Sequence, residues 1–218
     1  MTKLLNVSKK NILYSLILGE AFAWFLYLVI KNPYIEEFKG LASISSLVWI
    51  MPILFPVLFF LGLLAADFFS RFVKIAYQAI RFIEVGVLNT AIDFGVLNLL
   101  IWSTGSTEGL AIVPLNVISF LAATVNSYFW NKFWTFKAPD TLLGEKKRAG
   151  SEFAVFLLVS GIGIGINTGI VAAGTELISP LFSLSAGAWA NVMKICATIF
   201  SMAWNFVGYK FIVFKPKH

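Results

Sequence analysis

The sequence predicts an all-α integral membrane protein with six transmembrane helices, four of which form a core of two parallel two-helix repeats. Hydrophobic residues make up 59% of the 218 residues and charged residues only 13%, whereas a soluble domain carries about 25% charged residues. The mean hydropathy is +0.84, which also favours a membrane protein. The repeats are predicted by an internal similarity between residues that are 78 positions apart.

Six apolar segments are each about 20 residues long, which is enough for a helix to cross a hydrocarbon core of about 30 Å. The first of them contains Glu20 and is followed by no small-residue cleavage site, so we expect a retained span rather than a secretory signal. The six segments cover residues 12–30, 46–66, 82–102, 112–131, 153–175 and 187–209.

The distribution of Lys and Arg predicts the orientation of the spans. Most of the 17 basic residues lie near the two termini, between the second and third spans, or between the fourth and fifth spans. The loops on the other side of the membrane hold only Lys31 and Lys39. Because basic loops stay on the cytoplasmic side, we expect a multi-pass protein of the cell (cytoplasmic) membrane with both termini in the cytoplasm. We then expect the basic residues, which give the net charge of +6, to contact anionic membrane lipids. They are spread over several loops and form no concentrated patch for a nucleic acid.

The chain is predicted to have three parts. In the middle part, Phe68 and Phe72 fall on one side of a helix while Arg71 and Lys74 fall on another, a pattern typical of a helix that lies in the membrane interface. A simple extension of the second span is the alternative. The parts are an N-terminal two-helix membrane extension, an interfacial amphipathic linker helix and a four-helix transmembrane domain, at residues 1–66, 67–81 and 82–218.

The internal similarity preserves polar residues, which are costly in lipid unless they have a function. Asn89-Thr90 recurs as Asn167-Thr168, and Lys132-Phe133 recurs as Lys210-Phe211. Each half contains two spans, so both halves enter the membrane in the same direction, as in transporters with parallel repeats. We expect the repeated polar residues to gather in the cytoplasmic half of the membrane.

Motifs of soluble catalytic sites are absent from the sequence. The single cysteine is Cys196 and the single histidine is His218, so there is neither a disulfide framework nor a metal-ligand cluster. Serine has no histidine partner for a triad, and no glycine-rich phosphate loop follows a strand. We therefore expect no enzyme activity, no metal and no cofactor.

Four motifs lie between about residues 80 and 215. The segment from Phe82 to Phe94 reads F-I-E-V-G-V-L-N-T-A-I-D-F, and Asn131 to Phe136 reads N-K-F-W-T-F. The first resembles F-x-x-V-G-x-x-N-T-x-x-D-F and the second N-R-x-W-T-F, which are motifs of the GtrA-like family of small polytopic membrane proteins. The segments at residues 156–167 and 205–214 resemble the family as well.

The sequence departs from the family pattern in three ways: it has an extra N-terminal helix pair, Lys132 replaces the usual arginine, and Ser127 stands where asparagine is frequent. Lysine is a point charge and lacks the bidentate fork of arginine. Binding of a phosphate tolerates this exchange, but bidentate geometry does not.

The resemblance implies translocation (flipping) of a polyprenyl-phosphate-linked monosaccharide across the membrane for synthesis of cell-surface polysaccharide or another glycan. It also implies a glycosyltransferase partner that loads the sugar on the cytoplasmic face, and a similar domain is fused to some dolichol-phosphate-mannose synthases. The alternative is a non-transporting membrane anchor or regulatory subunit that docks a glycosyltransferase through the basic loop 137–152. A third function, transport of a small ion or metabolite, has no sequence motif in its favour. The protein could also form a homodimer.

We predict the substrate-binding residues among the polar residues of the core. Two lysines are expected to hold the phosphate, while Asp93 and two asparagines give the sugar a polar route, with Asp93 also able to carry a proton. Positive-inside anchoring is the alternative for the lysines, and hydrogen bonding between helices is the alternative for the asparagines. The predicted residues are Asn89, Asp93, Asn131, Lys132, Asn167, Lys194, Asn205 and Lys210.

Two acidic residues of the spans have a further prediction each. Asp93 could pair with Lys194 or Asn116 instead of binding a sugar. Glu84 lies close to the cytoplasmic end of its span, so we expect its carboxylate to reach water.

Overall fold

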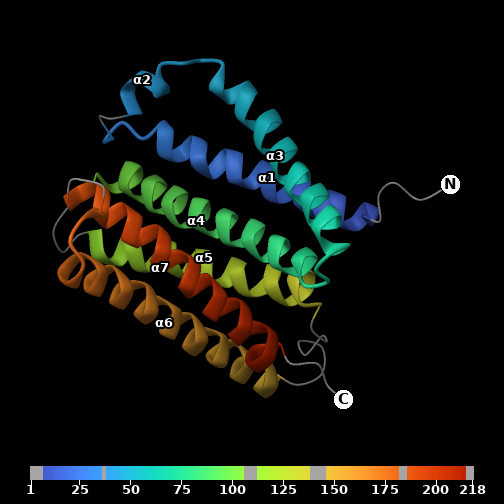
Figure 1. The fold of residues 1–218 in the computed structure, drawn as a ribbon. Helices are drawn as coiled ribbons and strands as arrows, with labels where there is room; N and C mark the ends of the chain where they lie inside the picture. Colours follow the sequence, from blue (N-terminus) through green and yellow to red (C-terminus); the bar gives the residue numbers. More distant parts are fainter. Residues whose placement is uncertain (1–6, 36–37, 106–111, 138–145, 182–185, 215–218) are drawn as a thin grey trace. The chain divides into compact units, whose positions relative to one another are not determined.

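The computed structural model describes residues 7–35, 38–105, 112–137, 146–181 and 186–214. The regular elements in these ranges are helices (Figure 1). Two of the helices continue into a short π-helical turn. In chain order they are α1 (Lys9–Ile30), α2 (Lys39–Ala42), α3 (Leu47–Ser70), α4 (Ala76–Thr104), α5 (Ile112–Trp130), η3 (Asn131–Thr135), α6 (Lys146–Leu177), α7 (Ala186–Gly208) and η5 (Tyr209–Val213). The all-α prediction is confirmed for the part of the chain that is described.

Among the described residues, five helical segments are long and apolar enough to cross a membrane. They coincide in position with five of the six predicted spans, which fits a multi-pass membrane protein. Helix α5 occupies the position of the fourth predicted span but is not among the five, so the count of six remains a prediction. The five segments are Lys9–Ile30, Leu47–Ser70, Ala76–Thr104, Gly150–Gly174 and Ile195–Val213.

The chain divides into two compact units, Met1–Thr135 and Phe136–His218. This division differs from the predicted boundaries at residues 66 and 81, because the N-terminal helix pair packs against α4, which in turn packs against α5 in the first unit. Residues 67–81 are shared between two helices rather than forming one linker helix. Helix α3 runs to Ser70, turns follow, and α4 begins at Ala76.

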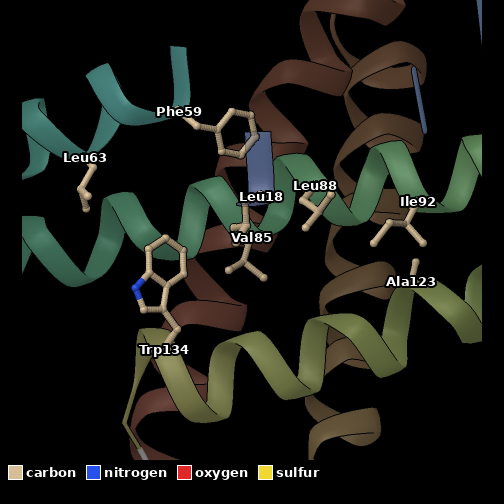
Figure 2. Close-up of a cluster of buried hydrophobic side chains, with 8 residues drawn as sticks. All are labelled: Leu18, Phe59, Leu63, Val85, Leu88, Ile92, Ala123 and Trp134. Atoms are coloured by element: carbon tan, nitrogen blue, oxygen red, sulfur yellow. The ribbon is translucent and has the colours of Figure 1, made fainter. Parts of the chain in front are cut away.

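The core of the first unit joins α1, α3, α4, α5 and η3. Figure 2 shows Val85, Leu88 and Ile92 of α4 along one side of that helix, with side chains from the neighbouring helices around them. Their spacing of three and four residues is that of a single helix face. Trp134 of η3 is buried against the same cluster, so the core reaches the end of α5.

Close approach of helix backbones supports this packing, as in other membrane proteins where small residues lie at helix interfaces. A Cβ atom built on Gly19 of α1 would lie 2.7 Å from the backbone nitrogen of Pro56 and 2.8 Å from the carbonyl oxygen of Phe55 in α3. A Cβ built on Gly95 of α4 would lie 2.9 Å from the carbonyl oxygen of Phe25 in α1. Both glycines therefore allow contacts that any larger residue would block.

The second unit is a hairpin of α6 and α7 that continues into η5. Gly163 of α6 lies against the Asn205 side chain of α7, and Gly208 lies against Val159 of α6. Aromatic rings close the end of the hairpin near η5. Phe156 stacks on Tyr209 with ring centroids 4.5 Å apart, and the Tyr209 hydroxyl lies 2.7 Å from the Ser160 hydroxyl.

Candidate functional site

A seam of hydrogen-bonded polar side chains joins α4 to α5. The Asn89 side-chain oxygen accepts a hydrogen bond from the Asn126 amide at 2.7 Å, and Asp93 accepts one from the Ser119 hydroxyl at 2.7 Å. Asn89 and Asp93 are four residues apart, so they lie on one face of α4. Both are half-buried, and the seam therefore presents carboxylate and amide groups over about one turn of the helix pair.

The described partner of Asp93 is not Asn116, which was one of the two predicted partners. Among the described residues its hydrogen-bond partner is Ser119 rather than Asn116. The Ser119 hydroxyl also lies 3.0 Å from the backbone carbonyl of Asn116, one turn earlier. Lys194 belongs to α7, but its side chain lies outside the described part of the structure.

Lys132 and Asn131 lie in the π-helical turn η3 that ends α5. Lys132 is fully buried, and its Nζ donates a hydrogen bond to the Tyr128 hydroxyl at 3.2 Å. The Nζ lies 5.4 Å from the centroid of the Tyr128 ring and 5.8 Å from that of Phe133. Asn131 is also buried, and its amide donates to the Ser127 carbonyl at 2.9 Å. The Lys132 ammonium is thus enclosed by aromatic side chains in this conformation.

The corresponding residues of the second unit have a related arrangement. Lys210 lies in η5 and is half-buried, with its Nζ 5.9 Å from the centroid of the Phe206 ring and 5.4 Å from that of Phe211. Asn205 of α7 lies against Gly163, and its buried side-chain oxygen has no hydrogen-bond partner among the described residues. Asn167 is half-buried on α6.

The two lysines share the same local chemistry. Each follows an aromatic residue by four positions and precedes another by one, and each lies in a π-helical turn at the C-terminal end of a long helix. The turns η3 and η5 are 78 residues apart, which is the offset of the sequence similarity. The aromatic rings can stabilise an ammonium by cation–π interaction, worth about 0.5–2 kcal/mol per contact.

Sequence reasoning missed Arg81, which is buried at the beginning of the first motif. Its guanidinium donates to the carbonyl oxygens of Trp134 and Thr135, at 2.6 and 3.3 Å. The guanidinium carbon also lies 4.9 Å from the centroid of the Tyr77 ring. By its position in the sequence, Arg81 belongs to the basic connection between the second and third apolar segments, and only its place directly before Phe82 distinguishes it from the other basic residues.

The expectation for Glu84 is wrong, because its carboxylate is buried rather than in water. Ser15 of α1 donates a hydrogen bond to Oε2 at 3.1 Å, whereas Oε1 has no hydrogen-bond partner among the described residues. A Cβ built on Gly62 of α3 would lie 2.9 Å from Oε1. Helices α1 and α3 therefore cover the face of α4 that carries Glu84.

Further polar contacts join the N-terminal helix pair to α4 and η3. The Asn11 amide donates to the Tyr77 hydroxyl at 2.9 Å, and its oxygen accepts from the Trp134 indole nitrogen at 3.1 Å. At the other end of α1, the Asn32 amide donates to the Asn98 side-chain oxygen at 2.6 Å. Among the described residues there is no cluster of His, Cys, Asp and Glu side chains that could hold a metal.

Comparison with known proteins places this arrangement in a family. The profile of the GtrA/DPMS transmembrane domain matches residues 81–214, from Arg81 to the residue after η5. The chain is also 37% identical over 134 residues to the uncharacterized membrane protein YngA of Bacillus subtilis (strain 168), an alignment that covers 62% of this chain and 77% of that protein. No solved structure matches the chain. The extent of the profile match shows that the chain belongs to the GtrA/DPMS transmembrane-domain family.

Proposed function

We propose that the protein translocates a polyprenyl-phosphate-linked monosaccharide from the cytoplasmic to the outer leaflet, for synthesis of cell-surface polysaccharide or another glycan. Membership of the GtrA/DPMS family supports a role in handling such lipids. The observation that carries the proposal is the paired lysine arrangement of η3 and η5, in which a cation lies near two aromatic rings at the C-terminal end of α5 and of α7. This arrangement suits a phosphate whose lipid chain remains in the bilayer.

The difference in solvent exposure between Lys210 and Lys132 suggests the order in which they bind the phosphate. Lys210 is half-buried and open to a headgroup, whereas Lys132 is fully buried. We propose that Lys210 holds the phosphate in the present conformation and that Lys132 binds it after its side chain leaves the contacts with Tyr128 and Phe133, while the backbone of η3 stays in place. A charge-assisted hydrogen bond to phosphate is stronger than a neutral one and offsets the loss of the aromatic contacts of the ammonium.

The seam between α4 and α5 is the proposed polar route for the sugar. Asn89, Asn126 and Asp93 offer amide and carboxylate groups that can exchange their mutual hydrogen bonds for bonds to sugar hydroxyls. The prenyl chain can follow the apolar side chains that α4 exposes, among them Val87 and Phe94. Movement is driven by the gradient of the lipid or by a proton carried on Asp93. A glycosyltransferase would load the sugar at the cytoplasmic face.

A reconstituted transport assay tests the proposal. Purified protein in proteoliposomes receives a radiolabelled polyprenyl-phosphate hexose, and the label that becomes accessible in the opposite leaflet is followed over time. Lys210→Gln and Lys132→Gln are each expected to slow translocation about tenfold or more, because they remove a charged partner of the phosphate. The matched control is Lys74→Gln, which removes an exposed lysine from the turn between α3 and α4.

The outcomes separate transport from anchoring. Equal rates for Lys74→Gln and the other two variants would contradict a phosphate role for Lys132 and Lys210. Absence of protein-dependent movement in folded wild type, with several sugars offered, would contradict translocation and favour a membrane anchor for a glycosyltransferase. In that case, reversing the charges of Lys146, Lys147 and Arg148 should release the enzyme from the membrane.

A further inference from the structure

Three side chains outside η3 hold this π-helical turn in place. Arg81 and Gln78 of α4 donate to its last carbonyl oxygens, and Asn11 of α1 accepts from the indole of its Trp134. Gln78 shares the Thr135 carbonyl with Arg81, at 3.2 Å from the Gln78 amide. We call Asn11, Gln78 and Arg81 the η3 clamp.

Two members of the η3 clamp, Gln78 and Arg81, donate hydrogen bonds to backbone carbonyl groups that have no partner within the helix. The last carbonyls of a helix have no partner within the helix, and an unsatisfied carbonyl is costly in a membrane. A cation near a helix C-terminus also interacts favourably with the helix dipole. The planar fork of Arg81 reaches two successive carbonyls at once. Both of its terminal nitrogens are therefore used by protein groups, which leaves Arg81 poorly placed to act as a ligand.

The clamp fixes the turn that carries Lys132. Lys132 precedes Trp134 by two residues, and Trp134 is held through its backbone by Arg81 and through its side chain by Asn11. Trp134 is also almost fully buried, so it leaves the turn little freedom to rotate. We therefore expect a change in the clamp to alter the direction in which the Lys132 ammonium points.

The second unit holds its turn with different chemistry. The position equivalent to Arg81 at the offset of 78 residues is Val159. There, η5 is contacted by the hydroxyl of Ser160 and by the ring of Phe156, both through Tyr209. An arginine clamp thus belongs to η3, and two of its members, Asn11 and Gln78, lie outside the residues 81–214 that match the family.

We infer that the η3 clamp positions Lys132 for the lipid phosphate, with Arg81 as the main positioning residue and Asn11 as the contribution of the N-terminal helix pair. This inference rests on the proposed function, because it assigns a purpose to the orientation of Lys132. It also gives the N-terminal helix pair a part in the phosphate site, beyond its part in the fold.

Hydrogen exchange measures the clamp without any need for transport. In the full-length protein in lipid nanodiscs, Arg81→Met should speed exchange of the backbone amides of residues 131–136 about tenfold or more. Arg81→Lys should restore part of the protection, because it keeps one charged donor. The matched control is Ser160→Ala, which should speed exchange in η5 and leave η3 unchanged. If Arg81→Met does not fold, Gln78→Leu and Asn11→Ala test the same contacts.

A double-mutant cycle tests the positioning role. Arg81→Met and Lys132→Gln should each raise the apparent KM for the labelled lipid, and the double variant should be no worse than Lys132→Gln alone, because the two changes act through one contact. Arg81→Met combined with Lys210→Gln should give additive effects.

Either of two results overturns the inference. One is wild-type exchange in η3 for all the clamp variants that fold. The other is a KM that stays unchanged in Arg81→Met while the maximal rate falls, which would show a purely structural role. If the wild type moves no lipid, the proposed function fails, and the exchange measurement alone decides whether the clamp holds η3.

Discussion

Two carboxylates of α4 illustrate how the environment of a single residue decides its role. Asp93 is half-buried and accepts a hydrogen bond from Ser119, on the seam with α5. Glu84 is buried on the side that α1 and α3 cover, and Ser15 donates to it. The side that faces α5 holds the proposed route for the sugar, while the side that carries Glu84 is closed by packed helices.

The effect of Asp93 on stability can be separated from its effect on function. Asp93→Asn should change the free energy of unfolding by less than about 1 kcal/mol, because the asparagine oxygen can still accept from Ser119. Ser119→Ala should destabilise the protein by about 0.6–2 kcal/mol, because it leaves the carboxylate without that donor. Thermal unfolding in detergent, followed by light scattering and intrinsic fluorescence, measures both. A large loss of stability in Asp93→Asn would show that the charge itself holds α4 and α5 together.

At the scale of helices, glycine determines how closely neighbouring backbones approach. Gly19 lies against the backbone of α3 near Pro56, where nothing can move aside. Gly161 of α6 has open space around the position of a Cβ atom. Both glycines therefore lie within helices, but only Gly19 is in close contact with a neighbouring helix.

Substitution of these glycines by alanine should give opposite results. Gly19→Ala should destabilise the protein by about 1–3 kcal/mol through overpacking. Gly161→Ala should be neutral or stabilising by up to about 1 kcal/mol, because alanine favours helix more than glycine does. The thermal midpoints of the two variants, measured side by side in one detergent, give the comparison. Equal midpoints would mean that α1 and α3 are not in close contact at Gly19.

Most elements were predictable from the sequence, because apolar runs of about 20 residues define membrane helices. The turn between α3 and α4 was not, since Phe68 and Phe72 continue a helical pattern through the point where α3 ends at Ser70. The site was predicted only in part. The burial of Glu84 and the bonds of Arg81 depend on residues 69 and more than 50 positions away. A local sequence pattern cannot predict contacts between residues that are so far apart in the chain.

At the scale of the molecule, the N-terminal helix pair is an integral part of the first compact unit. It contacts α4 near both ends, through Asn11 and Tyr77 at one end and Asn32 and Asn98 at the other. Such hydrogen bonds are worth about 0.6 kcal/mol each in membranes, so close helix packing must contribute most of the association.

Splitting the chain in the turn between α3 and α4 tests this integration. Fragments 1–73 and 74–218, expressed together, should assemble in the membrane and copurify in a mild detergent. Asn32→Leu should weaken the association only slightly, whereas Gly19→Leu should prevent it by separating α1 from α3. Fragments that fail to copurify would contradict an integral role for the helix pair.

We propose that the protein moves a polyprenyl-phosphate-linked sugar across the bilayer along the seam that contains Asp93. The most direct test is the initial rate of translocation of the labelled lipid by wild type and by Asp93→Asn, in proteoliposomes that contain equal amounts of folded protein. We predict protein-dependent movement in the wild type and movement at the background rate in the variant. Equal rates in the two proteins would exclude a required Asp93 charge, and a folded wild type that leaves every offered sugar lipid in its original leaflet would contradict translocation itself.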